Sequence, residues 1–184
     1  MLDRALIDYC SPTLARLKLG SMCTCAIDED FCGEFQLLRG QLAAKGLTLV
    51  TLRVRQGSAL VYLYRADELA RELQRDDVWR FLRAYGYERP DVQGVVATLK
   101  RRMRESEEFP HEIGVFLGYP LSDVIGFIAN KGQNCLCCGC WKVYSNACDA
   151  MRAFQRFRKC KAVYRQRFAS GCPLTQLTVA ARTA

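Results

Sequence analysis

The sequence predicts an α+β fold in which one sheet of about four strands is covered by helices. The segments 47–55 and 59–65 alternate in polarity, are rich in β-branched and aromatic residues, and flank the turn residues Gln56–Ser58, which together indicate a β-hairpin. Much of the remaining chain has apolar residues at helical spacing, which favours helices packed on the sheet. The length of 184 residues suits a single domain spanning residues 1–184.

Five helices are expected in the first part of the chain. They cover residues 2–9, 31–45, 66–74, 77–85 and 91–107. Pro12 should end the first helix, because a residue that precedes a proline disfavours the α-helical region. Asp30 and Asp76 can cap the second and fourth helices, and Gly46 and Gly86 follow these helices as stop signals.

The second part of the chain is expected to supply the other two strands. Ile113–Gly118 predicts a short buried strand, and Trp141–Tyr144 predicts the last strand. Between them, Pro120 and Ser122 open a further helix. A long basic helix should cover residues 147–169, and a short terminal helix should follow it.

Four of the eleven cysteines lie within six residues and form two overlapping C-x-x-C pairs. These candidate metal ligands are Cys135, Cys137, Cys138 and Cys140. Zinc knuckles and many iron–sulfur loops use this spacing, because a tight turn brings residues i and i+3 to the same side of the chain. Zinc and iron are therefore candidate cofactors.

Four thiolates this close together do not easily close one tetrahedral site, so a second pair is expected from elsewhere. Cys23 and Cys25, with Cys32 behind them, form one candidate pair, and Cys148 and Cys160 form the other. Two alternatives stay open. The clustered cysteines exchange electrons as redox thiols, or they pack as small buried hydrophobic residues.

His111 is the only histidine, so any acid–base or Cys–His mechanism would have to use it, although no catalytic residue is assigned. It lies at the entrance of the predicted strand and Tyr119 lies at the exit, so an extended strand would hold the two at opposite edges. Ligands in sheet proteins gather where strands end and helices begin. The predicted ligand-binding residues are therefore Tyr119, Ser122 and Asp123.

The net charge of +8 comes entirely from the last quarter of the chain. Residues 142–184 hold nine Lys or Arg against the single acid Asp149, whereas the charges of residues 1–141 balance. Arg152, Arg156 and Lys159 share one face of the basic helix by their spacing. This face predicts either a solvated surface or a docking site, for an acidic protein such as a flavodoxin in preference to nucleic acid.

No apolar run approaches the roughly 20 residues that a membrane span needs, so no membrane association is expected. The N-terminal segment MLDRALIDYC mixes Asp3, Arg4 and Asp8 into its apolar residues and lacks the core of a signal peptide. The expected location is the cytoplasm, where cysteines are reduced. The odd number of cysteines also argues against a disulfide framework.

Six segments of the chain resemble one bacterial family. They are SPTLARLK (11–18), LVYLYR (60–65), HEIGVFLGYP (111–120), DVIGFIANKG (123–132), CGCWKVY (138–144) and LTVAAR (177–182). The family that they resemble is domain-of-unknown-function family 3793, which often has a glycine after the PTLA residues, where this chain has Arg16. The resemblance implies no activity. The predicted function is therefore a cysteine-based metal-binding or thiol redox protein or, alternatively, a binding module that docks through residues 147–169.

Overall fold

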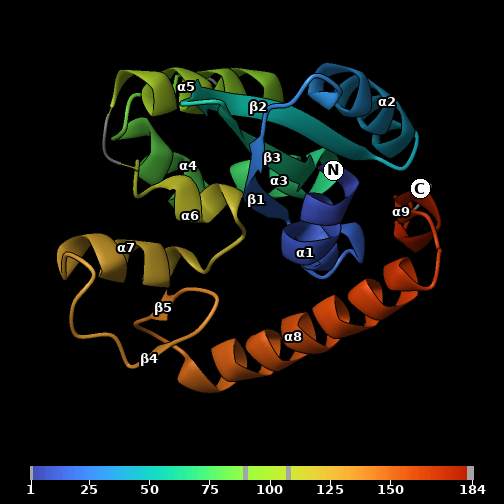
Figure 1. Ribbon diagram of the computed structural model, residues 1–184. Helices are drawn as coiled ribbons and strands as arrows, with labels where there is room; N and C mark the ends of the chain where they lie inside the picture. The colour runs from blue at the N-terminus through green and yellow to red at the C-terminus, as the bar shows by residue number, and fades with distance from the viewer. Residues whose placement is uncertain (1, 89–90, 107–108, 182–184) are drawn as a thin grey trace.

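A computed structural model shows a three-stranded antiparallel sheet between two layers of helices (Figure 1). It describes residues 2–88, 91–106 and 109–181. The strand order across the sheet is β1 (Gly20–Ala26), β3 (Ser58–Arg65) and β2 (Leu47–Arg55). The α+β prediction is confirmed, but this sheet has three strands rather than about four, and a separate pair of short strands lies later in the chain.

Strands β2 and β3 form the hairpin that the alternating pattern predicts. Gln56 and Gly57 make its turn with positive φ angles of 48° and 69°, the left-handed region that two-residue hairpin loops favour. The sequence does not predict β1, because this segment holds small and polar residues rather than β-branched ones. β1 pairs antiparallel with β3 along its whole length and brings Cys23 and Cys25 into the interior.

The side chains of β3 alternate between two hydrophobic cores, one on each face of the sheet. The first core lies beneath α3 (Ala66–Leu73), α4 (Asp76–Arg83), α5 (Val92–Glu105) and α6 (Ile113–Phe116). The second core lies beneath α1 (Leu2–Leu14), α2 (Phe31–Ala43) and α9 (Leu174–Leu177). We call the sheet together with these helices the sandwich.

Residues 119–146 form a smaller part beside the sandwich, which we call the lobe (Figure 1). Its elements are α7 (Leu121–Ala129), β4 (Cys137–Cys138) and β5 (Lys142–Val143). The two strands pair antiparallel as a short ribbon. The predicted strand at 141–144 is therefore present as β5, but it belongs to this ribbon and not to the central sheet.

The long helix α8 (Ala147–Ala169) connects the lobe to the sandwich and has the bounds that the sequence predicts (Figure 1). Near its start, Phe154 packs beneath the ribbon, and near its end, Phe168 packs on the second core beside α1. Arg165 donates from α8 to the carboxylate of Asp8 on α1 at 2.6 Å. No helix within the described residues is both long and apolar enough to cross a membrane.

The predicted strand at 113–118 is wrong, because Ile113–Phe116 form the short helix α6. Every residue of that helix is buried, and a short apolar run that is buried on all sides fits a strand and a helix equally well. Gly118 then turns the chain with a φ of 70°, at a point where an added β-carbon would lie 2.9 Å from Leu19.

Helix α1 continues through Pro12 to Leu14 instead of ending before the proline, which corrects a second prediction. A proline has no N–H, so the carbonyl of Asp8 lacks its usual partner within the helix. Arg165 of α8 donates to this carbonyl at 3.5 Å, so a neighbouring helix supplies the missing contact.

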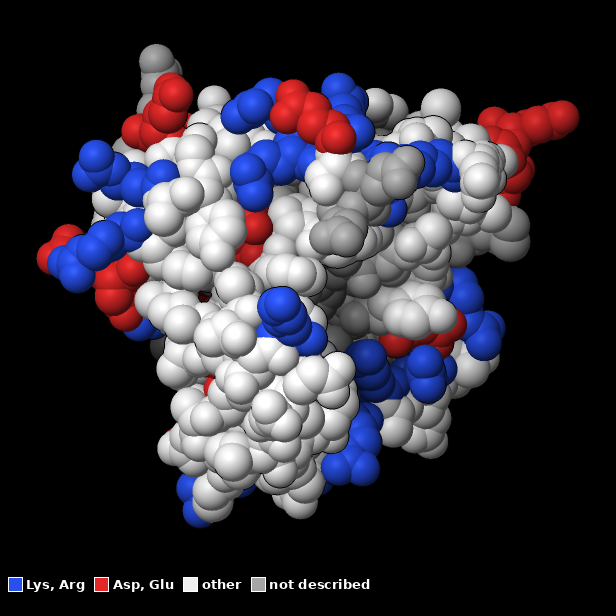
Figure 2. Space-filling view, turned by 90° about the vertical axis from the view of Figure 1, so that its left-hand side faces the viewer, with Lys and Arg blue, Asp and Glu red and all other residues white. Residues whose placement is uncertain are grey.

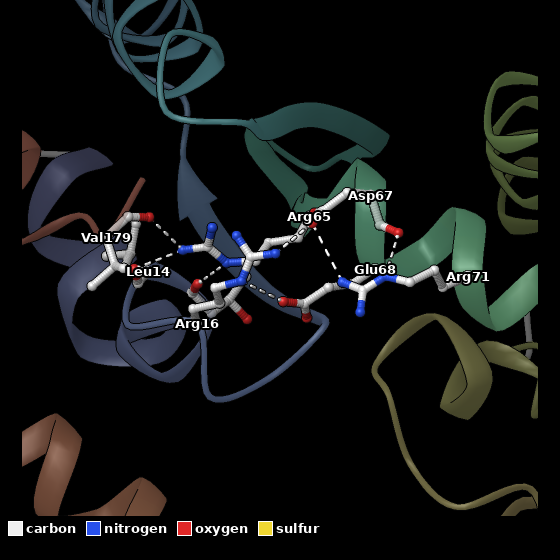
Figure 3. A network of polar contacts seen from close by, with 8 residues as sticks. Leu14, Arg16, Arg65, Asp67, Glu68, Arg71 and Val179 are labelled. Carbon is white, nitrogen blue, oxygen red and sulfur yellow. Dashed lines mark hydrogen bonds and ion pairs between the residues drawn. The ribbon is translucent and has the colours of Figure 1, made fainter. Parts of the chain in front are cut away.

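Arg65, at the end of β3, is buried and connects three segments of the sandwich (Figure 3). Its Nε donates to the carbonyl of Thr13 at 3.0 Å. Its Nη2 donates to the carbonyls of Leu14 and Val179 at 2.9 and 2.8 Å. Because the last carbonyls of a helix have no partner within it, this guanidinium caps α1 and also fixes the C-terminal segment.

Arg16 makes the turn after α1 in the left-handed conformation, with a φ of 58°. Glycine is favoured in this region. The Arg16 side chain pairs with Asp67 and, at 3.2 Å, with Glu68 on α3, next to the Arg65 guanidinium (Figure 3). Arg16 thus makes a turn that favours glycine and also forms contacts that a glycine lacks.

Candidate functional site

A cavity of about 330 Å³ lies between α6, α7 and the β4–β5 ribbon, at the junction of the sandwich and the lobe. Its walls are mostly apolar and aromatic side chains, namely Phe109, Pro110, Ile113, Tyr119, Val124, Phe127 and Trp141. Its polar lining consists of His111, Asp123, Cys138 and Lys142. Ligand pockets usually measure ~300–1,000 Å³ and combine apolar walls with a few polar groups, so this cavity has the character of a small-molecule site.

His111 and Tyr119 line the same cavity, so the expectation that they lie at opposite edges is wrong. A helix rises only ~1.5 Å per residue, against ~3.3 Å in a strand, and α6 therefore keeps the two residues close. His111 is exposed at the edge of the cavity, and its ring meets the ring of Phe127 edge-on at 5.1 Å. The imidazole has no hydrogen-bond or ion-pair partner within the described chain.

Asp123 is buried and accepts four hydrogen bonds, which fix the segment after the ribbon against α7. Its Oδ1 accepts from the backbone amides of Tyr144 and Ser145, both at 2.9 Å, and from the Ser145 hydroxyl at 2.7 Å. Its Oδ2 accepts from the Trp141 indole at 2.8 Å. Burial alone would raise the pKa of Asp123, but these hydrogen bonds together lower it below the usual value. The carboxylate therefore organises the site and has little capacity left for a ligand.

The three predicted ligand-binding residues have different places in the structure. Tyr119 and Asp123 line the cavity, whereas Ser122 does not and donates instead to the Ser145 hydroxyl at 3.0 Å. The Tyr119 hydroxyl donates to the carbonyl of Cys140 at 3.1 Å, and its ring stacks on Trp141 with centroids 4.9 Å apart. Burial raises the pKa of Tyr119 to about 12.

Lys18, from the sandwich, lies over the ring of Tyr119, with its Nζ 4.9 Å from the ring centroid. Burial lowers the pKa of this ammonium to about 8. Tyr119 therefore lies between an indole of the lobe and a cation of the sandwich. This stacking makes one wall of the cavity part of the junction between the two regions.

The ribbon separates the clustered thiols instead of collecting them. Cys137 and Cys138 are neighbours in β4, so their side chains point to opposite faces. Cys137 packs on the small core that contains Val143 and Phe154, whereas Cys138 is exposed and lines the cavity. Cys140 is exposed in the turn that follows. The pair Cys137 and Cys140 is thus divided between the interior and the surface.

The hydroxyl of Tyr144 is buried and has no hydrogen-bond partner among the described residues. Its pKa is raised by burial and then by the charges that Cys135 and Cys138 would carry as thiolates. The Tyr144 side chain lies directly on Gly126 of α7, where an added β-carbon would lie 2.5 Å from the Tyr144 β-carbon and 2.6 Å from its ring.

The second cysteine pair that a metal site would need does not join this group. Cys23 and Cys25 lie in the second core with their sulfurs 3.8 Å apart, and Cys160 lies on the buried face of α8. Among residues 2–88, 91–106 and 109–181, no three His, Cys, Asp or Glu side chains are arranged to hold a metal ion. The residues thus do not fit a zinc or iron centre in this arrangement, and the metal site stays a prediction.

The basic face of α8 is exposed, as its spacing predicts. Arg152 pairs with Asp149 at 3.5 Å. Arg156 and Lys159 have no ion-pair partner in the part of the chain that the structure describes. On the side of the molecule that carries the lobe, charged groups gather over the sandwich, while the lobe below is mostly uncharged (Figure 2).

Phe127, Trp141, Lys142 and Tyr144 are not among the predicted ligand-binding residues. A signal for them exists in the sequence, because Phe127 lies in the segment 123–132, and the other three lie in 138–144. These are two of the segments that carry the family resemblance, and both lie in the lobe.

A protein-family model described as "Protein of unknown function (DUF3793)" matches residues 6–178. The match covers nearly the whole chain and confirms the resemblance that the six segments indicate. No curated protein and no solved structure matches the chain.

Proposed function

We propose that this chain, which belongs to the DUF3793 family, is a thiol–disulfide redox protein with Cys135 and Cys138 as its reacting pair. The observation that carries the proposal is that Cys138 is exposed at the cavity and has the half-buried Cys135 as the other thiol of its C-x-x-C pair. A C-x-x-C pair is a common arrangement for reversible disulfide formation. In a reducing compartment such as the cytoplasm, the pair would rest as two thiols.

Cys138 is the better placed attacking group, because it is exposed, whereas Cys135 is half-buried. The Cys138 thiolate attacks one sulfur of a disulfide substrate, the substrate S–S bond breaks, and the other substrate sulfur leaves and takes up a proton. Cys135 then loses its proton and attacks the sulfur of Cys138, which releases the second substrate thiol. The substrate gains two electrons and two protons, and a Cys135–Cys138 disulfide forms.

Tyr144 is a neutral neighbour of this pair. Its raised pKa keeps the phenol protonated. Its hydroxyl has no hydrogen-bond partner within the described chain, so neither thiol is bonded to it in this structure. A protonated phenol adds no negative charge near the thiols, so it does not oppose formation of the Cys138 thiolate.

Disulfide mapping in a glutathione redox buffer tests the proposal. As the glutathione disulfide fraction rises, we expect one disulfide to form first, between Cys135 and Cys138, as read by peptide mass spectrometry. Cys135→Ser and Cys138→Ser should abolish it, while the matched variant Cys172→Ser should leave it unchanged. A first disulfide between Cys137 and Cys140, or none, would reject the proposal. Zinc or iron bound by the anaerobically purified protein would favour the metal-binding alternative.

A second candidate function rests on α8. Arg156 and Lys159 lie exposed and without ion pairs in the described chain, which favours a docking surface for an acidic protein. Reversing the charges of Arg152, Arg156 and Lys159 should weaken such binding, and added salt should weaken it too. Retention on DNA or RNA at low salt, falling steeply with salt, would instead indicate nucleic acid as the partner.

A further inference from the structure

We infer that the cavity at the junction of the sandwich and the lobe binds a small planar aromatic anion, with Lys142 as its charge partner. The cavity measures about 330 Å³, many times the ~30 Å³ share of one liquid water, so it has room for a small molecule. Its walls are mostly apolar with a few polar groups, which is the usual make-up of a ligand pocket.

The walls select a flat apolar ligand. Tyr119 and Trp141 stack on one another, and Phe127 lines the cavity with its ring edge-on to His111. Aromatic rings prefer offset-stacked or edge-to-face contacts with other rings. Trp141 and Lys18 already occupy the faces of Tyr119, so this wall offers ring edges to a flat ligand, together with the Phe127 ring. The volume lies at the lower end of the range for ligand pockets, which suits a ligand of one or two fused rings.

The polar groups select a negative charge on that ligand. The Trp141 indole and the Tyr119 hydroxyl already donate within the protein, and the Asp123 carboxylate already accepts four hydrogen bonds. His111, Cys138 and Lys142 remain, and of these Lys142 carries a positive charge at neutral pH. Lys142 uses one of its three N–H donors on the carbonyl of Gly132 at 2.6 Å, so its charge and two donors are available.

An NMR titration with 2-naphthoate, and with the uncharged 2-naphthamide for comparison, tests the inference. The protein has two tryptophans, so a Trp79→Phe background leaves the Trp141 indole as a single resonance inside the cavity. We expect 2-naphthoate to shift this resonance saturably and to bind about tenfold more tightly than the amide, as one charge-assisted hydrogen bond allows. Lys142→Gln, which can still donate to Gly132, should remove that preference for the anion.

Lys131→Gln is the matched control, because Lys131 lies in the same lobe but does not line the cavity, and it should leave the preference intact. Phe127→Ala should weaken both probes. The absence of saturable 2-naphthoate binding, equal affinity for the two probes, or a preference that survives Lys142→Gln would each overturn the inference. Binding should persist in Cys135→Ser, so the outcome is independent of the thiol chemistry proposed above.

Discussion

The sandwich and the lobe each contain a buried charged side chain that holds backbone groups, but the two charges connect very different lengths of chain. In the sandwich, Arg65 donates to three carbonyls that belong to the end of α1 and to the C-terminal segment. In the lobe, Asp123 accepts four hydrogen bonds, all from within residues 141–145. The first charge therefore stabilises the whole fold, and the second orders one local segment beside the cavity.

The cysteines show the same contrast. Cys23 and Cys25 are buried in the sandwich, and their pKa values are raised, mainly by hydrogen bonds among the thiols Cys10, Cys23 and Cys25 and by burial. Thiols of this kind stay protonated and unreactive. Cys138 and Cys140 of the lobe are exposed. Residue type alone therefore does not identify a reactive cysteine, because its surroundings decide the matter.

The contrast suggests where function resides. In the sandwich, the buried carboxylate of Glu112 receives the Arg102 guanidinium at 2.6 Å. Buried polar atoms without a partner in the described chain occur in both regions, on Arg16, Arg53 and Arg65 of the sandwich and on Tyr144 of the lobe. Arg16 and Arg65 still bind through their other nitrogens, whereas the hydroxyl is the only polar atom of the Tyr144 side chain. An unpartnered hydroxyl costs stability, so its position in the lobe favours a role in binding or chemistry there.

The largest expected effect comes from Arg65→Met. This change removes three hydrogen bonds: the Val179 carbonyl loses its donor, while the Thr13 and Leu14 carbonyls keep the backbone amides of Arg16 and Val179. Because an unsatisfied buried group costs ~1–3 kcal/mol and each other lost bond costs less, the free energy of unfolding should fall by about 3 kcal/mol. Urea denaturation measures it. Arg71→Met on the exposed face of α3 is the control and should change stability by less than about 0.5 kcal/mol. A loss below about 1 kcal/mol in Arg65→Met would contradict the assigned role.

Asp123→Asn should have a smaller and local effect. The asparagine side chain keeps one acceptor oxygen, but its NH₂ group then faces a donor that the second carboxylate oxygen had accepted from. This clash of donors should lower the stability of the lobe by about 2 kcal/mol. The Tyr144 and Ser145 amides should then exchange hydrogen faster, while β3 amides stay protected. If β3 exchange accelerated equally, the lobe would not be an independent unit. Asp28→Asn, an exposed control, should leave both unchanged.

The lowered pKa of Asp123 adds a pH dependence to this prediction. Its ionised form is favoured in the folded lobe, so its contribution is complete above the ordinary value of 3.8 and is lost as pH falls through the lower folded pKa. Amide exchange at Tyr144 should therefore accelerate in acid beyond the intrinsic rate. Asp123→Asn should lack this acid dependence, and an identical profile in the variant would assign the effect to another group.

A stabilising effect is expected from Lys18→Met, at the junction of the two regions. The pKa of Lys18 is lowered from 10.5 to about 8, so the folded protein disfavours its charge, and stability should rise with pH between these two values. Removing the ammonium should stabilise the protein near pH 7 by about 1 kcal/mol, after discounting its partial exposure and the lost contact with the Tyr119 ring.

Urea denaturation at two pH values tests the sign. The gain from Lys18→Met should disappear above pH 10.5, where the amine is neutral in both states. Lys159→Met, on the exposed face of α8, should show no such change. A gain that is the same at both pH values would mean that packing, not the charge, is responsible.

The spacing of apolar and polar residues predicted the elements that depend mainly on their own sequence, namely the hairpin and α8. The hairpin follows from alternation, and the bounds of α8 follow from helical spacing between Asn146, whose side chain caps the first turn, and the glycine at 171. β1 was not predictable in this way, since Gly20–Ala26 is held by pairing with β3 and not by its own propensity. The same limit explains the error at α6, where burial on every side removes any periodicity.

Two of the predicted ligand-binding residues, Tyr119 and Asp123, line the cavity. Both were predicted from their place at the start of a helix. The cavity itself joins residues 109–142 across a helix, a second helix and a ribbon, so its shape depends on a fold-back that the strand prediction at 113–118 excluded. Likewise, the C-x-x-C spacing indicated reactive cysteines, but strand alternation in β4 decides which thiols can meet.

The smallest expected effect is that of Ser122→Ala, and this variant tests whether the site extends beyond the cavity to the start of α7. Ser122 was predicted to bind ligand from its place at a helix start, yet its exposed hydroxyl contacts only the Ser145 hydroxyl. Losing one exposed hydrogen bond should cost less than about 0.5 kcal/mol. Binding of 2-naphthoate should be unchanged, because Ser145 still donates to Asp123. If Ser122→Ala weakened that binding as much as Lys142→Gln, the ligand would lie at the start of α7 and not in the cavity.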